Sequence, residues 1–104
     1  MRRRYDMPIP YKSTPVFDET TLPAALRREH RTKDGVWGVI RVLEGEVRLV
    51  LDDGSDAAGT VLTPDRPGLV LPEQPHHVEP LGRMRMQVDF HDHAPEGFSR
   101  ACEP

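Results

Sequence analysis

Histidines are the side chains of this sequence best suited to ligand chemistry, and the chain has five of them. Imidazole is the commonest protein ligand for divalent transition metals, and it titrates near neutral pH. His30 and His76 lie far apart along the chain, so they meet only if their strands face a shared interior. We predict that they meet there and bind a divalent transition metal, namely zinc, iron, nickel or copper.

The alternation of nearby residues indicates the direction of the His30 side chain. If residues 30–42 form one continuous strand, His30 shares the parity of the apolar Ile40 and Val42, which predicts that it points inward. A bulge at Gly35 would break this count. The alternative is that His30 and His76 are pocket histidines that hydrogen-bond to carboxylates and bind no metal.

Two histidines leave a metal site one protein ligand short, because such sites use three or four. Asp34 has the parity of His30 and is the first candidate for the third ligand. Period two turns His77 to the face opposite His76. Asp89 has the parity opposite to the apolar residues of its segment, so we expect it to point outward.

Other side chains could line the same pocket. Thr32 and Lys33 are suited to an anion, since a hydroxyl donates a hydrogen bond and an ammonium group is a point charge. Met84 and Met86 are typical of a core, but a thioether facing a pocket would favour a soft metal or a chalcogen oxyanion. The possible pocket residues are Thr32, Lys33, Asp34 and Met86.

The remaining reactive side chains predict no covalent catalysis. Ser13, Ser55 and Ser99 lie in segments typical of turns or tails, without a histidine beside them. Cys102 is the single cysteine, which excludes an internal disulfide and a cysteine-based zinc site. The segment His91–His93 follows the last apolar residue, so we expect both of its histidines to be solvated.

The composition predicts one small domain that is rich in short strands. The chain has 104 residues, of which 37% are hydrophobic, and 11 prolines and eight glycines leave little room for long helices. A net charge of −3 offers no electrostatic footprint for nucleic acid. No apolar run approaches the roughly 18 residues of a membrane span. The basic start at residues 2–4 lacks the apolar stretch of a secretion signal, so we expect a cytoplasmic protein.

The elements that must position these side chains are short strands separated by turn signals. A threonine, an early proline and helix formers predict one short helical turn at residues 20–26. Glu44 and Gly45 predict a hairpin turn after which residues 46–52 return antiparallel to residues 36–43. The predicted strands are residues 13–18, 36–43, 46–52, 60–63, 69–71, 76–80 and 82–91, with a loop at residues 53–59. Strands of this spacing are typical of an all-β sandwich or barrel.

Two stretches of the sequence resemble the cupin family. Residues 42–47 (VLEGEV) resemble the hairpin that closes the first cupin motif, and residues 67–79 (PGLVLPEQPHHVE) resemble the second motif. Residues 29–38 and 72–79 are similar to a narrower group, the TehB/YeaR-like small cupins, which includes the N-terminal domain of some tellurite-resistance methyltransferases. This resemblance covers residues 13–90.

The resemblance implies an all-β fold of cupin type, a double-stranded β-helix or jelly-roll-like barrel with a pocket at its wide mouth. It also implies a homodimer. The expected organisation is an N-terminal arm at residues 1–12, a cupin domain at residues 13–91 and a C-terminal tail at residues 92–104.

The departures from the cupin pattern bear on the ligands. Thr32, Asp34 and Gly38 stand where the first motif has two histidines and a glutamate. The histidine of the second motif carries over directly onto His76, and His30 is a displaced candidate for the first. The sequence has no glycine-rich nucleotide loop, so we expect no tellurite methylation by these residues alone.

We therefore expect a small cupin that binds a metal ion, a small molecule or a small anion in its barrel, associated with tellurite or oxidant stress. One alternative is a mononuclear enzyme with non-haem iron or zinc and open coordination positions. The other is a metal-free interaction module whose barrel is filled by its own side chains. We expect neither nucleic acid nor a membrane as a partner.

Overall fold

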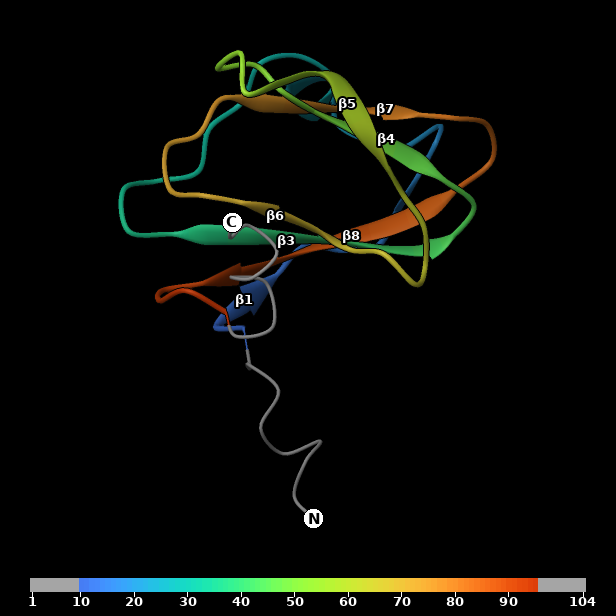
Figure 1. Ribbon diagram of the computed structural model, residues 1–104. Coiled ribbons are helices and arrows are strands. Elements are labelled where there is room, and N and C mark those ends of the chain that lie inside the picture. The colour runs from blue at the N-terminus through green and yellow to red at the C-terminus, as the bar shows by residue number, and fades with distance from the viewer. Residues whose placement is uncertain (1–9, 96–104) are drawn as a thin grey trace.

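The computed structural model describes residues 10–95, and these form two antiparallel sheets that face each other (Figure 1). The large sheet has the order β1-β8-β3-β6, with β2 also paired to β8, and the small sheet has the order β5-β4-β7. Neither sheet closes into a barrel. The strands of the large sheet are β1 (Lys12–Ser13), β2 (Phe17–Asp18), β3 (Trp37–Glu44), β6 (Gly68–Val70) and β8 (Arg85–His91). Those of the small sheet are β4 (Val47–Leu51), β5 (Asp56–Leu62) and β7 (His76–Pro80).

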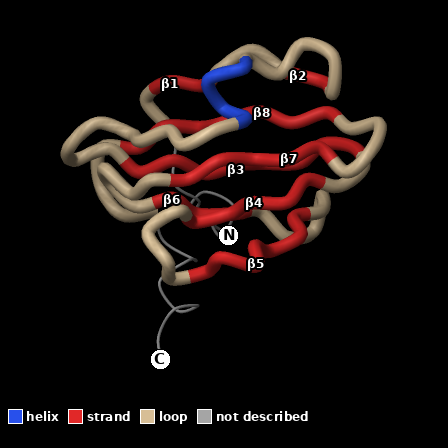
Figure 2. The backbone as a smooth tube through the Cα atoms, turned by 90° about the horizontal axis from the view of Figure 1, so that it is seen from above, coloured by secondary structure: helices blue, strands red, loops and turns tan. Residues whose placement is uncertain are grey.

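Helix is almost absent, and the one helical element of residues 10–95 is the 3₁₀ helix η2 (Ala24–Arg27). In Figure 2 it lies between β1 and β2 at one side of the molecule. The segment that carries it leaves the large sheet at β2 and reaches the small sheet at His30, which forms an isolated bridge with His76. The segment therefore covers the side between β8 and β7. The all-β class and the single short helical turn are confirmed.

The core lies between the two inner faces, because alternate side chains of a strand point to the same face of its sheet. On the large sheet, Ile40 pairs with Val88 and Val42 with Met86 across β3 and β8. The prediction that Met84 and Met86 belong to the core is confirmed, since both are fully buried. The buried core consists of Leu22, Ile40, Val42, Val47, Leu49, Leu62, Val70, Val78, Met84, Met86 and Val88.

The turn after β3 does not make the predicted hairpin. β3 pairs with β6 and β8, whereas β4 pairs with β5 and β7, so the chain changes sheets at Gly45. Gly45 has a φ of 78°, and a Cβ there would collide with the carbonyl oxygen of Arg83. The alternation of apolar residues on both sides of the turn is the same whether the two strands pair within one sheet or face each other in two sheets. The sequence pattern therefore does not distinguish these two arrangements.

Three other predicted elements differ in their bounds. Residues 30–42 are not one strand: β3 begins at Trp37, and residues 31–36 form a loop with a turn. β5 begins at Asp56, inside the predicted loop at residues 53–59. The predicted strand at residues 13–18 is two short strands interrupted at Pro15, a residue that cannot donate to a strand ladder.

Parts of the predicted arm and tail fall outside the described residues, namely residues 1–9 and 96–104, and so do Ser99 and Cys102. Within residues 10–95, no helix is long and apolar enough to cross a membrane.

Candidate functional site

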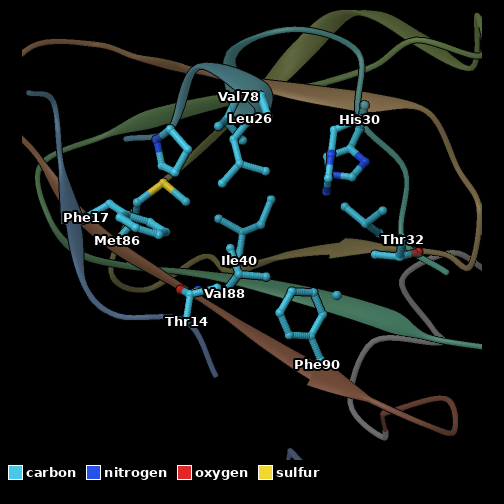
Figure 3. Close-up of a pocket in the computed structure, with 15 residues that line it drawn as sticks. Thr14, Phe17, Leu26, His30, Thr32, Ile40, Val78, Met86, Val88 and Phe90 are labelled. Atoms are coloured by element: carbon cyan, nitrogen blue, oxygen red, sulfur yellow. The ribbon is translucent and has the colours of Figure 1, made fainter. Parts of the chain in front are cut away.

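A cavity of about 260 Å³ lies between the two sheets. Strands β3, β6 and β8 line it from the large sheet and β7 from the small one, while residues 23–32 close its side. Its wall is apolar except for Thr14, His30, Thr32 and His76. Figure 3 shows His30 and Thr32 at one end of the cavity and Phe17 and Met86 at the other. The full lining is Thr14, Phe17, Pro23, Ala25, Leu26, His30, Thr32, Gly38, Ile40, Val70, His76, Val78, Met86, Val88 and Phe90.

The structure brings His30 and His76 together through their own backbones. The amide of His30 donates to the carbonyl of His76 at 2.7 Å, and the amide of His76 donates back at 2.8 Å. The two rings meet edge to face, with centroids 5.6 Å apart and an interplanar angle of 79°. This single bridge, not a long strand, fixes the position of His30.

The protonation of His76 follows from its surroundings. Its Nδ1 lies 2.9 Å from the carbonyl oxygen of Gln74, which can only accept, so Nδ1 carries the proton and Nε2 keeps a lone pair. Burial lowers the pKa of His76, and His30 lowers it further. At neutral pH the ring is therefore neutral, and Nε2 can accept a hydrogen bond or bind a metal ion.

Thr32 lines the cavity, but its hydroxyl is already engaged. Its Oγ1 donates to the carbonyl of Leu71 at 3.2 Å and accepts from the amide of Glu73 at 3.1 Å. These two bonds tie the loop at residues 31–36 to the turn after β6. Thr32 thus shapes the wall, and an anion would have to compete for its hydroxyl.

The other predicted pocket residues separate into two groups. Met86 lies in the cavity wall and is fully buried. Lys33 and Asp34 are exposed and do not line the cavity, because residues 31–36 leave the strand and the parity count from His30 ends there. Lys33 lines a separate hollow outside it. The expectation that Asp34 supplies a third inward ligand is therefore not met by its position.

The residues present do not fit a metal site with three protein ligands. Among residues 10–95, no group of three histidine, cysteine, aspartate or glutamate side chains could hold a metal ion. His76 has the orienting bond to a backbone carbonyl that metal-binding histidines commonly make. The cavity nevertheless offers two such ligands and no carboxylate. Metal binding by His30 and His76 stays a prediction.

Two polar residues of β8 lie outside the cavity wall. Asp89 has the parity opposite to Met86 and Val88, and its carboxylate accepts hydrogen bonds from Arg41 Nε at 2.6 Å and Ser13 Oγ at 2.7 Å. His91 was expected to be solvated, but it is the last residue of β8 and is buried. The expectation was wrong because the strand continues past its last apolar residue. His93 is exposed, as expected.

Sequence reasoning missed one wall of the cavity. Phe17, Pro23 and Leu26 close the side between the sheets. The sequence of a short helical turn does not by itself indicate that the turn lines a pocket. The available signal was local: apolar residues in a segment too short to bury them by itself must pack on another element.

Comparison with known proteins places this geometry in a family. Residues 12–88 match the family model of the TehB-like domain. The chain is 34% identical over 74 residues to a probable S-adenosyl-L-methionine-dependent methyltransferase, TehB of Haemophilus influenzae strain 10810. That alignment covers 68% of this chain and 26% of TehB, so the chain spans about a quarter of the length of this relative.

Two solved structures share the fold. The crystal structure of TehB from Haemophilus influenzae superposes with a TM-score of 0.70 and 31% identity, covering 79% of this chain and 30% of that one. A protein from Escherichia coli K12 gives a TM-score of 0.69 and 23% identity, covering 79% of this chain and 87% of that one. The second likeness concerns the fold alone. On the family match over residues 12–88, the chain belongs to the TehB-like domain family.

Proposed function

We propose that this chain is a ligand-binding module that holds a small molecule between its two sheets. The observation that carries the proposal is the apolar cavity of about 260 Å³ with two adjacent imidazoles as its polar end. Ligand sites are typically mostly apolar, with a few polar groups that fix orientation. Such a site binds a molecule with an apolar body and one polar group directed at His30 and His76.

The size of the cavity limits the ligand. An apolar cavity of about 150 Å³ in another protein holds one benzene molecule. A cavity of about 260 Å³ has room for a substituted ring or a short branched chain, about ten non-hydrogen atoms in all. The neutral Nε2 of His76 would accept a hydrogen bond from a ligand that carries a donor, such as a hydroxyl group.

We further propose that the fold is a cupin-type jelly roll. The strand order supports this: from β3 to β8 the chain alternates between the two sheets, and only β4 and β5 are consecutive neighbours in one sheet. The bridge from His30 to His76 extends the small sheet by one position beyond β7. Crossing connections of this kind are typical of double Greek-key sandwiches.

The biological setting proposed for this module rests on the family. The relative's name describes a methyltransferase that depends on S-adenosyl-L-methionine, and this chain matches 26% of that protein. We propose a binding role associated with tellurite or oxidant stress, with no methyl transfer by the residues given. The homodimer and the cytoplasmic location stay predictions.

A titration with 4-methylphenol tests the binding module directly. We expect saturable NMR shift changes at the side-chain methyl groups of Ile40, Val78 and Met86 in protein treated with a chelator. The variant Val78→Phe fills the cavity and should abolish them. Leu43→Phe adds similar bulk at a residue that is 40% exposed and should leave them unchanged. Equal binding by both variants, or no saturable change, would refute the proposal.

The metal-dependent alternative has its own measurement. It requires near-stoichiometric iron, zinc, nickel or copper in protein purified without chelator, and a loss of that metal in both His30→Ala and His76→Ala. Under our proposal the metal content stays far below stoichiometry, and 4-methylphenol binds to the chelator-treated protein all the same.

A further inference from the structure

A second hollow adjoins the polar end of the cavity. It has a volume of about 230 Å³ and shares His30, Thr32 and Phe90 with the cavity wall. Because His30, Thr32 and Phe90 line both spaces, the hollow lies next to the histidine end of the cavity. The hollow is therefore the place where a polar group of the ligand would lie.

The charge of the hollow is positive. Lys12, Arg31 and Lys33 line it together with His30, and among residues 10–95 no aspartate or glutamate does. The Arg31 guanidinium is partly compensated, since it binds the exposed carboxylate of Glu29 at 3.1 Å. This local charge opposes that of the whole chain, which is −3. A basic surface on an acidic protein favours a negative ligand at that surface.

The apolar cavity and the basic hollow select different parts of one molecule. A carboxylate has a large free-energy cost in an apolar cavity without a partner, so it would stay in the hollow, where water and cations reach it. The apolar body would fill the space between the sheets. An inorganic oxyanion has no such body, and a cationic ligand would be repelled by the lysines.

We infer that the ligand is a small organic monoanion, whose apolar part lies between the sheets and whose carboxylate lies beside Lys12 and Lys33. This inference rests on the proposed binding module and adds the chemical class of its ligand. Lys12 is held at this position because its strand residue pairs with Phe90, which lines both spaces. Lys33 is held by the loop that Thr32 ties to the turn after β6.

Calorimetric titration with three probes tests the ligand class. The probes are 4-methylbenzoate, its neutral analogue 4-methylbenzamide, and inorganic phosphate, all at low ionic strength and neutral pH. We expect the benzoate to bind about tenfold more tightly than the amide, and phosphate to show no saturable binding. The preference for the benzoate should shrink in high salt, since exposed charges are screened.

A double variant assigns the preference to the lysines. Lys12→Gln combined with Lys33→Gln should bring the benzoate to within about twofold of the amide and leave amide binding unchanged. Arg83→Gln is the matched control, because it removes a positive charge just before β8 begins at Arg85, at the end of the strand away from Phe90. It should keep the full preference.

The outcomes separate this inference from the proposed function. An amide that binds as tightly as the benzoate overturns the monoanion and leaves the binding module standing. Phosphate binding as tightly as the benzoate also overturns it, because the apolar body would then contribute nothing. If neither organic probe binds, the binding module fails together with the inference. A preference that survives the double lysine variant overturns the assignment of the carboxylate to the hollow.

Discussion

His76 and His77 are adjacent on β7, and their surroundings shift their pKa values in opposite directions. His76 is 5% exposed, lies in the cavity wall and donates from Nδ1 to the carbonyl of Gln74. His77 lies between two carboxylates, with Nδ1 2.8 Å from Asp52 and Nε2 3.0 Å from Glu79. Burial lowers the pKa of His76, whereas the hydrogen bonds to Asp52 and Glu79 raise the pKa of His77. One ring is a neutral acceptor and the other is suited to carry a proton.

The difference follows from the pleat of the strand, which sends successive side chains to opposite faces. The inner face offers few polar partners and removes water, so it holds an imidazole in the neutral form. The outer face holds a row of charges, in which Glu79 also lies 3.4 Å from Arg48. The two carboxylates at His77 bind opposite edges of its ring, so they do not converge on a common metal position. Residue type alone therefore does not identify which histidine is the candidate for ligand binding.

The largest expected effect contrasts the two faces of β8. Met86→Ala removes a fully buried side chain beside an existing cavity, and we expect it to lower the free energy of unfolding by about 2–5 kcal/mol. Gln87→Ala, on the outer face, loses hydrogen bonds to Arg41 and to the carbonyl of Thr14, and should cost about 1 kcal/mol. Chemical denaturation of both variants measures the contrast. Equal losses would contradict the assignment of the inner face.

The strands themselves were predictable because alternation reports burial. Strands were predicted at residues 36–43 and 46–52, and β3 and β4 lie there. The side chains of Ile40, Val42, Val47 and Leu49 are buried, as the alternation predicts, but Val39 and Val50 on the other face are buried as well. The alternation does not indicate which strands pair with each other. The change of sheet at Gly45 depends on its contact with Arg83, a residue far along the chain, so it was not available from the local pattern.

The candidate site was predicted in part, and the reason given for it was incomplete. His30 does reach the cavity, but through one bridge to His76 and not through a continuous strand to Ile40. The same break removes Asp34 from the interior. The wall formed by residues 23–26 depends on how a segment outside the strands packs over the gap between the sheets, and no periodicity encodes that.

The next effect tests ligand binding at the two histidines. His76→Ala removes the Nε2 acceptor and should weaken 4-methylphenol binding by about tenfold, the value of one hydrogen bond of about 1.4 kcal/mol. His77→Ala leaves the cavity wall intact and should change the affinity by less than about twofold. Calorimetric titration of both folded variants measures the difference. An equal loss in the two variants would remove the distinction between them.

A smaller expected effect is that His76 and His77 change the stability of the protein in opposite directions as the pH changes. The pKa of His77 is raised in the folded state, so its contribution to stability is fully present below the unfolded value, which is about 6.5. It is lost as the pH rises through the folded pKa. The variant His77→Gln should therefore be less stable than the parent protein at low pH, by up to about 1 kcal/mol, and approach it at high pH.

The pH dependence of stability that His76 contributes has the opposite sign. Its folded pKa is lowered, so the unfolded chain binds the proton more readily, and the folded protein loses stability as the pH falls below about 6.5. His76→Gln should remove this acid-dependent loss. Urea denaturation at pH values from about 5 to about 9 measures the free energy of unfolding of both variants. Parallel pH profiles for the two variants would contradict the opposite environments of the two rings.

The smallest expected effect adds a methyl group to the inner face at Gly38. A Cβ there would lie 3.6 Å from Cγ2 of Thr32 and 3.8 Å from Cγ1 of Val88, which are ordinary contact distances. Gly38→Ala should raise the free energy of unfolding by about 0.5 kcal/mol, because alanine has less freedom to lose in a strand. Gly54→Ala is the control on the exposed loop, where a φ of 89° makes any side chain strained, and it should lower stability.

Since Gly38 lines the cavity, its variant should also bind 4-methylphenol more weakly than the parent protein, whereas the Gly54 variant should bind it equally well. A more stable Gly38 variant with unchanged probe affinity would mean that the ligand does not reach the wall beside Thr32, and would contradict a ligand whose polar group is directed at the histidine end.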